Sequence, residues 1–230
     1  MNTFKLVCFD LDDTLWPCMP TILRAEKSLY NWLEKHRPEV TQIYSADELR
    51  SKRLKLASNQ PELKHNLTKL RKASFKELSS EFNYDTQWID EAFNVFYEAR
   101  QQISFYDDVS STLLKLKQQY QLAAMTNGNA DIYRTSLGHL FDYSISAEKV
   151  GSAKPDSDMF EALLAQSDRS ADEVLYIGDH PIHDIEGAHN MGIVNVWLNR
   201  HGEEWSHQDV TPDHMIQSLY ELVEYLGLKP

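Results

Sequence analysis

Several features that would point to other classes of protein are scarce or missing in this chain. It has two cysteines, 23 basic against 35 acidic residues, and no apolar run near the ~18 residues that a membrane helix needs. The net charge of −12 repels nucleic acid and anionic membranes, and no run of Lys or Arg suggests contact with a phosphate backbone. We therefore expect neither a nucleic-acid nor a membrane partner, and nothing in the sequence indicates a protein partner.

Cysteine usage and the first residues bear on the cellular compartment. Cys8 and Cys18 are close in sequence, and Cys8 lies in an expected buried strand. Two free thiols in a reducing compartment are therefore favoured over a disulfide. Residues 1–6 lead straight into a short apolar run, without the long apolar stretch and cleavage site of a secretory signal. Together these observations predict a cytoplasmic protein.

Short apolar runs, most of which stop at a polar residue or a glycine, recur along the chain. Runs of this length suit strands covered on both faces, as in a parallel sheet. The expected strands are 4–9, 122–125, 143–147, 174–177 and 193–198. Helical patterns separate the later strands, and 213–226 is expected to be a closing helix. The alternation predicts a doubly wound, Rossmann-like α/β core, with the carboxyl ends of its parallel strands along one edge.

The stretch 17–103 breaks that alternation. Apolar residues recur in it at helical spacing, as in Ile22, Leu29 and Leu33. There is no internal repeat and no low-complexity linker. We expect an all-helical insertion at 17–103, following the first strand of a core formed by 1–16 and 104–230.

Two acidic residues, Asp10 and Asp12, directly follow the first expected strand. Carboxylates two residues apart face the same way when the chain is extended. Asp10 is placed to attack a substrate, and Asp12 can serve first as an acid and then as a base. Clustered carboxylates repel one another, which a hard divalent cation with oxygen ligands offsets. Taken alone, the segment is equally consistent with an acidic turn.

Three further segments supply polar groups at or near strand ends. Thr126 and Asn127 precede a glycine and offer a hydroxyl, an amide and backbone N–H groups to an anion. Lys154 lies in a polar loop before a helix. Asp179 and Asp184 follow a later strand, where Asp179 could bind a metal while Asp184 supports it or caps the helix. Taken singly, Thr126 and Asn127 are better explained by a common turn, and a lone lysine such as Lys154 by a solvated charge.

The four segments, in this order, resemble those of the haloacid dehalogenase-like hydrolase superfamily. The resemblance covers the whole chain and implies that the helical insertion is a cap over the core. It implies that Asp10 is the nucleophile and a metal ligand. It also implies that Asp12 protonates the leaving group, later activates water, and contributes its backbone carbonyl to the metal. The implied cofactor is Mg²⁺.

The resemblance implies roles for the other segments as well. Asp179 would be the remaining metal ligand, Asp184 would support it, and Thr14 would brace the loop of the first motif.

Thr126 and Asn127 would hold the transferred phosphoryl group, and Lys154 would neutralise its charge and that of Asp10. Such donors and cations supply the charge cancellation that phosphoryl transfer needs.

Several chemistries of the superfamily fit this sequence to different degrees. Asp12 favours phosphate esters over carbon–halogen bonds, because the dehalogenases need no metal and lack this second acid. A sugar-phosphate mutase would keep the same core residues, and a phosphonate hydrolase would need a cap lysine for a Schiff base. A non-catalytic phosphate-binding protein is opposed by the complete set of catalytic side chains. His180 and His183 could suggest a transition metal, but the expected ligands are oxygen atoms.

The resemblance also implies that residues of the cap govern which substrate is accepted. The segments 20–26 and 126–130 resemble bacterial phosphatases that act on FMN and on phosphoribitylaminouracil, a riboflavin precursor. The sequence therefore predicts a magnesium-dependent phosphatase that acts on a small phosphorylated metabolite through an aspartyl-phosphate.

Overall fold

A computed structural model describes residues 4–228, which divide into two compact units. One is a helical unit, Cys18–Ile103. The described residues on either side of that segment form an α/β unit. Among the described residues, no helix is both long and apolar enough to cross a membrane.

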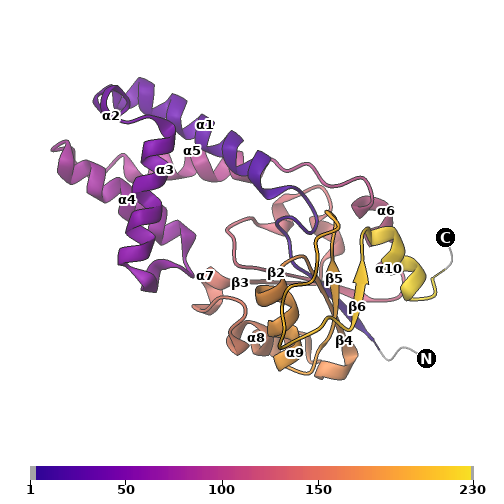
Figure 1. The fold of residues 1–230 in the computed structure, drawn as a ribbon. Helices are drawn as coiled ribbons and strands as arrows, with labels where there is room; N and C mark the ends of the chain where they lie inside the picture. The colour runs from indigo at the N-terminus through magenta and orange to yellow at the C-terminus, as the bar shows by residue number, and fades with distance from the viewer. Residues whose placement is uncertain (1–3, 229–230) are drawn as a thin grey trace. The chain divides into compact units, whose positions relative to one another are not determined.

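The α/β unit is built on a parallel sheet of six strands within the described residues, in the order β3-β2-β1-β4-β5-β6 (Figure 1). The strands are β1 Leu6–Phe9, β2 Gln121–Thr126, β3 Tyr143–Ser146, β4 Val174–Gly178, β5 Val194–Leu198 and β6 His214–Ile216. β1 and β4 are neighbours, and the chain's connections run in opposite directions on either side of them. Ligands of such sheets bind at this switch point, beyond the carboxyl ends of the strands. The predicted doubly wound α/β fold is confirmed.

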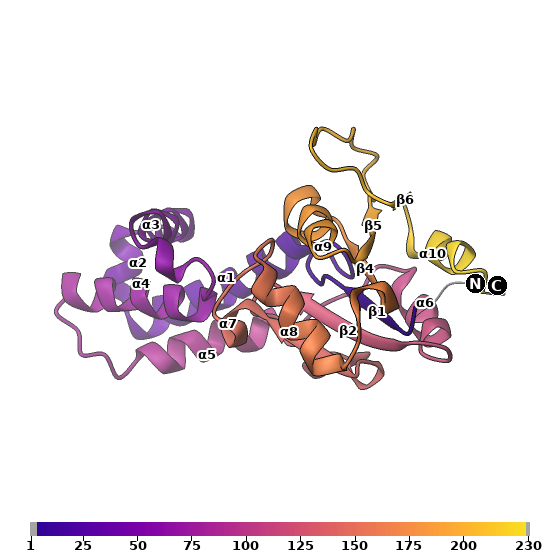
Figure 2. The ribbon, with the colours of Figure 1, turned by 90° about the horizontal axis from the view of Figure 1, so that it is seen from below.

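Helices cover both faces of this sheet (Figures 1 and 2). One face carries α6, Val109–Leu116, which packs against α10, Leu219–Tyr225. The other face carries α8, Ser157–Ser167, and α9, Gly187–Asn190, with the short α7, Ala147–Val150, beside β3. The core under α8 and α9 is formed by alternate strand residues and the apolar face of α8; it includes Leu6, Cys8, Met125, Tyr176, Met159, Phe160 and Leu163. Burial on both faces explains why the strands read as continuous apolar runs.

The expected closing helix at 213–226 is wrong in its first part. His214–Ile216 forms β6, which pairs in parallel with Val196–Leu198 of β5, and the helix begins only at Leu219. Three strand residues are too few to show a periodicity of two. The sheet edge, rather than local preference, fixes this segment as a strand, and Ile216 is buried there.

The helical unit is held together by apolar and aromatic side chains. Its helices are α1 Cys18–His36, α2 Pro38–Ile43, α3 Ala46–Asn59, α4 Leu67–Glu81 and α5 Ile89–Arg100. α1 packs along α5, burying Leu29 and Leu33 against the aromatic residues of the unit. Ser45 and Glu48 form a reciprocal capping box that fixes the start of α3.

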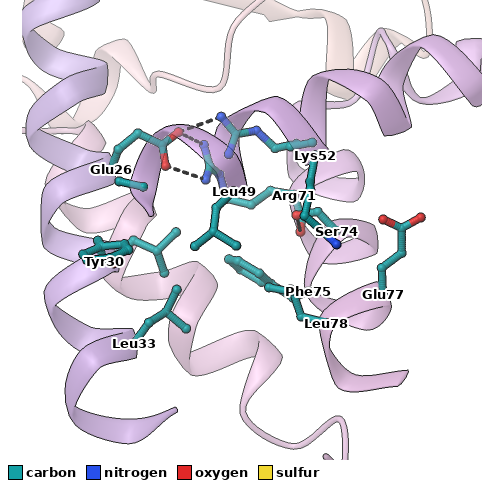
Figure 3. Close-up of a pocket in the computed structure, with 13 residues that line it drawn as sticks. Glu26, Tyr30, Leu33, Leu49, Lys52, Arg71, Ser74, Phe75, Glu77 and Leu78 are labelled. Atoms are coloured by element: carbon teal, nitrogen blue, oxygen red, sulfur yellow. Dashed lines mark hydrogen bonds and ion pairs between the residues drawn. The ribbon is translucent and has the colours of Figure 1, made fainter. Parts of the chain in front are cut away.

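A small hollow of about 30 Å³ lies inside the helical unit (Figure 3). Leu33, Phe75 and Leu78 line part of it. Elsewhere the carboxylate of Glu26 binds the guanidinium groups of Arg71 and Arg53 at 2.8 and 2.6 Å. The hollow has room for about two water molecules. Because its volume is small and its charged groups are paired, we interpret the hollow as part of the packed core of the helical unit.

Candidate active site

The first element of the site is Asp10, which directly follows β1. Its backbone N–H donates to the carbonyl of Ile177 in β4, at 2.9 Å, so the backbone of Asp10 remains tied to the sheet. Its side chain is largely buried. The acid therefore stands at the carboxyl ends of β1 and β4, where the two halves of the sheet meet.

A tight turn carries the chain from Asp10 to Asp12 and beyond. Asp13 adopts a left-handed backbone with a φ of 61°, and its N–H donates to the carbonyl of Trp16 at 2.8 Å. The indole Nε1–H of the fully buried Trp16 donates to Oδ1 of Asp12 at 2.8 Å. The hydroxyl of Thr14 donates to Oδ1 of Asp179 at 3.0 Å. The turn thus orients Asp12 and joins the first acidic motif to the last.

β2 ends at Thr126, which begins the second segment of the site. Thr126 Oγ1 accepts a hydrogen bond from the backbone N–H of Gly128, at 2.9 Å. The amide of Asn127 bonds the loop of Lys154 in both directions: Nδ2 donates to the Lys154 carbonyl at 3.0 Å, and Oδ1 accepts from the Lys154 N–H at 2.8 Å. Asn127 thereby fixes the backbone of the loop that carries the lysine.

The ammonium group of Lys154 is the buried cation of the site. Its Nζ lies 2.6 Å from Oδ1 of Asp10 and 2.6 Å from Oδ1 of Asp184. It also donates to the hydroxyl of Tyr176 at 2.9 Å and to the carbonyl of Met125 at 3.2 Å. Burial alone would lower the pKa of Lys154, but the carboxylates of Asp10 and Asp184 raise it above its usual value. Lys154 is therefore held in its charged form between two acids.

Asp184 is fixed by hydrogen bonds to both of its carboxylate oxygens. Oδ1 accepts from Tyr176 at 3.0 Å as well as from Lys154, and Oδ2 accepts from the N–H of His180 at 2.9 Å. Gly178 makes room for this carboxylate, because a Cβ atom there would lie 2.3 Å from Cγ of Asp184. Asp184 is thus placed to hold Lys154 rather than to offer an uncommitted oxygen.

A single cavity of about 180 Å³ brings the predicted side chains together. Its lining includes Asp10, Asp12, Thr126, Asn127, Lys154, Asp179 and Asp184. Thr14 is buried and reaches the site through its bond to Asp179. All predicted site residues therefore meet at one edge of the sheet.

The donor set of this cavity fits a hard divalent cation. Among the described residues, carboxylate oxygens of Asp10, Asp179 and Asp184 lie within 4.8 Å of one another. Burial raises the pKa of Asp10 well above its usual value, although Lys154 opposes the shift. Burial, and then the charge of Asp184, raise the pKa of Asp179 to about 7. The cluster is thus short of positive charge, and oxygen ligands of this kind are those that Mg²⁺ prefers.

Two aromatic residues and an arginine support the site, and the sequence did not predict their contacts. Tyr176 is hidden within an apolar strand run, and Trp16 directly follows the first acidic motif, where no local pattern indicates its bond to Asp12. The signal for both is chemical: a buried phenol or indole needs a hydrogen-bond partner. Arg200 donates to the carbonyl of Thr14, a contact across the fold that no local pattern indicates.

His180 and His183 line the same cavity, where they contact each other and the backbone that follows His180. Nδ1 of His180 accepts hydrogen bonds from the N–H groups of Ile182 and His183, at 3.2 and 3.1 Å. The two imidazole rings stack with their centroids 3.9 Å apart. The pair therefore shapes the wide helical turn Pro181–Glu186 that carries Asp184.

Comparison with known proteins adds independent evidence. A model of haloacid dehalogenase-like hydrolases matches residues 7–198. The 5-amino-6-(5-phospho-D-ribitylamino)uracil phosphatase YigB of Escherichia coli is 28% identical over 202 residues, 86% of this chain and 84% of that protein. The glyceraldehyde 3-phosphate phosphatase of Pyrococcus furiosus is 25% identical over 238 residues, covering 98% of this chain and 94% of that protein.

A crystal structure of a 2-haloacid dehalogenase from Pseudomonas syringae matches the fold with a TM-score of 0.90 and 36% identity. The match covers 97% of this chain and 98% of that one. The family model spans both the helical unit and the segments that carry the acidic motifs. The chain belongs to the haloacid dehalogenase-like hydrolases, as the order of its motifs predicted.

Proposed function

We propose that this chain is a magnesium-dependent phosphatase that hydrolyses a small phosphomonoester through an aspartyl-phosphate on Asp10. The observation that carries the proposal is that Asp10 and Asp12 line one cavity with Lys154, whose Nζ lies 2.6 Å from Asp10. A nucleophile, a proton donor and a buried cation are the groups that this chemistry needs. The phosphatases among its relatives support the same reaction class.

Asp10, the backbone carbonyl of Asp12, and Asp179 would hold the cation. Bound there, Mg²⁺ would draw charge from the phosphoryl oxygens and offset the repulsion between the carboxylates and the phosphate. Lys154 would neutralise charge next to Asp10. The hydroxyl of Thr126, which accepts from Gly128 and can still donate its own proton, and the backbone N–H of Asn127 would orient the phosphoryl oxygens.

Asp10 and Asp12 then divide hydrolysis into two displacements. A carboxylate oxygen of Asp10 attacks phosphorus, the bond to the leaving group breaks, and Asp12 gives its proton to the departing oxygen. The carboxylate of Asp12 next takes a proton from water as the water oxygen attacks phosphorus. The bond to Asp10 breaks, inorganic phosphate leaves, and both carboxyl groups return to their starting states.

Asp12 argues for phosphate esters over the carbon–halogen bonds named for the Pseudomonas syringae protein. A halide departs without a proton, so a general acid has no task in that first step. An alcohol leaving group departs far more easily when it is protonated. The hydrogen bond from Trp16 Nε1 to Asp12, 2.8 Å long, holds this acid in one orientation beside the nucleophile.

Within the phosphatases we propose FMN or a riboflavin-pathway phosphate as the substrate. One support is the activity named for the Escherichia coli relative, 84% of whose length is covered by the match. The other is the local resemblance of segments 20–26 and 126–130 to phosphatases of this kind. A sugar-phosphate mutase or a phosphonate hydrolase would use the same core. The substrate panel below separates these from hydrolysis of a phosphate ester.

The test is phosphate release from FMN, 5-amino-6-(5-phospho-D-ribitylamino)uracil, sugar phosphates and nucleotides, with Mg²⁺ and with a chelator. Asp10→Asn should lower kcat at least about a thousandfold and Asp12→Asn at least about a hundredfold, with the fold checked by circular dichroism. Asp168→Asn is the matched control, because Asp168 is exposed and ends α8 away from the cavity. Turnover that survives Asp10→Asn or the chelator would refute the mechanism, and equal rates on FMN and unrelated sugar phosphates would remove the substrate assignment.

A further inference from the structure

Arg200, two residues after the end of β5, reaches back to the turn that carries Asp12. Its Nε and Nη2 atoms donate to the backbone carbonyl of Thr14, at 3.3 and 3.0 Å. The side chain of Arg200 is 11% exposed, so these bonds are largely shielded from water. Shielded, charge-assisted hydrogen bonds are among the stronger ones in proteins.

Asp108, at the start of α6, fixes the other side of the same guanidinium. Nη1 and Nη2 of Arg200 lie 2.9 and 3.0 Å from the two carboxylate oxygens of Asp108, a bidentate pair. Asp108 in turn accepts from the N–H of Leu219 at 2.8 Å. The guanidinium carbon also lies 4.0 Å from the ring centre of Tyr106. These partners hold the guanidinium group of Arg200 in one orientation.

The contact falls on a turn that needs external support. Asp13 has a φ of 61°, in the left-handed region that residues with a side chain rarely adopt. Thr14 follows it, bonded through its carbonyl to Arg200 and through its hydroxyl to Asp179. Arg200 therefore acts on the residue that links the two acidic motifs.

The same guanidinium lies where the core chain leaves for the helical unit and returns from it. The N–H of Tyr106, on the returning segment, donates to the carbonyl of Leu15, on the outgoing segment, at 3.0 Å. Arg200 contacts Thr14, which precedes Leu15 on the outgoing segment, and Asp108, which lies two residues after Tyr106 on the returning segment. It thus ties these two segments of the α/β unit to the end of β5.

We propose that Arg200 is a positioning residue for the proposed phosphatase reaction, acting through Thr14 on the orientation of Asp12 and Asp179. This inference rests on the proposed function. Arg200 itself touches neither the nucleophile nor the cavity of Asp10. Its loss acts on the chemical step, because a displacement of about 1 Å in a catalytic group can cost a hundredfold in rate.

The test compares Arg200→Gln and Arg200→Lys with the wild type on the best substrate of the panel. Arg200→Gln should lower kcat at least about tenfold while KM stays within about threefold, since binding groups are retained. Arg200→Lys keeps the charge without the planar fork and should retain an intermediate kcat. Arg169→Gln, which removes a guanidinium bonded to Gln121 elsewhere in the core, should leave kcat within about twofold of the wild type.

A second readout needs no turnover. Amide hydrogen exchange across residues 10–16 should become at least about tenfold faster in Arg200→Gln, and stay unchanged in Arg169→Gln. If the folded Arg200→Gln protein keeps both the wild-type kcat and the wild-type exchange, the inference is wrong. It is also wrong if kcat falls only in proportion to the folded fraction. A wild type that releases no phosphate would refute the proposed function alone, and the exchange measurement would still decide whether Arg200 holds the turn.

Discussion

The phenolic oxygen of Tyr176 lies 2.9 Å from Nζ of Lys154 and 3.0 Å from Oδ1 of Asp184. The phenol accepts from the ammonium group and donates to the carboxylate. All three side chains are almost completely buried. Tyr176 therefore orders the ion pair that faces Asp10 without itself carrying charge.

Replacing Tyr176 by Phe removes one oxygen atom and leaves the aromatic packing in place. Lys154 and Asp184 each lose a buried partner, so the free energy of unfolding should fall by about 1–3 kcal/mol. Because the ammonium group is less well fixed beside Asp10, kcat should fall roughly tenfold. Chemical denaturation and steady-state kinetics measure the two effects. Wild-type values for both would show that the phenol has no part in holding the lysine.

Removing the charge of Lys154 should have a much larger effect. Lys154→Met leaves Asp10 and Asp184 buried without their cation, and breaking a buried pair in this way costs about 3–5 kcal/mol. Phosphate release should fall by about a hundredfold to a thousandfold, the effect of losing one charge-stabilising donor. The matched control is Lys117→Met, because Lys117 pairs with Asp142 at the surface and should lose less than about 1 kcal/mol. Equal losses in the two variants would contradict the assigned role of the buried cation.

Much of this site follows from where the strands end. Parallel strands share one edge, so Asp10 after β1 and Asp179 after β4 must approach each other once β1 and β4 are neighbours. The polar residues at these ends are visible in the sequence because the apolar runs stop there. Their convergence could therefore be predicted, although the order of the strands could not be read from any single run.

Other parts of the site depend on contacts that local patterns do not contain. Tyr176 looks like any aromatic residue in a buried strand, and its hydroxyl acquires meaning only when Lys154 is placed beside it. Arg200 reads as a surface charge after the last long strand, yet it binds Asp108 and Thr14 across the fold. For such residues the partner is set by tertiary packing.

Replacing Gly178 by alanine is expected to reduce both stability and activity. An added Cβ would lie 2.3 to 2.5 Å from three side-chain atoms of Asp184, so the acid would have to move away from Lys154. Gly178→Ala should lower the free energy of unfolding by about 1–3 kcal/mol and reduce kcat. The measurements are thermal or chemical unfolding and initial rates.

A double-mutant cycle separates this clash from a general effect of Gly178→Ala on the strand. In an Asp184→Gly background the three clashing atoms are gone, so adding Gly178→Ala should cost much less than it does in the wild type. Additive losses would show that the two residues act independently and that the close contact is not what requires glycine.

In the helical unit, Glu26 is bound by two guanidinium groups. Burial raises the pKa of its carboxyl, but Arg71 and then Arg53 outweigh burial and lower it below the ordinary value of 4.5. A carboxylate whose pKa is depressed on folding stabilises the native state above its unfolded pKa, and this stabilisation is lost as the pH falls through the folded value. Glu26 should therefore contribute fully near neutral pH and progressively less below pH 4.5.

Glu26→Gln tests this pH dependence directly. At pH 7 the variant should be about 3 kcal/mol less stable than the wild type, because Arg71 and Arg53 lose their shared carboxylate. The difference should shrink as the pH is lowered, since the wild-type acid becomes protonated and loses its advantage over glutamine. Asp90→Asn is the control: Asp90 pairs with Lys72 but is 79% exposed, so its removal should change stability by less than about 1 kcal/mol at every pH. Urea unfolding of all three proteins between pH 3 and 7 supplies the comparison. A stability difference for Glu26→Gln that stays constant across this range would mean that the carboxylate charge is not what stabilises the helical unit.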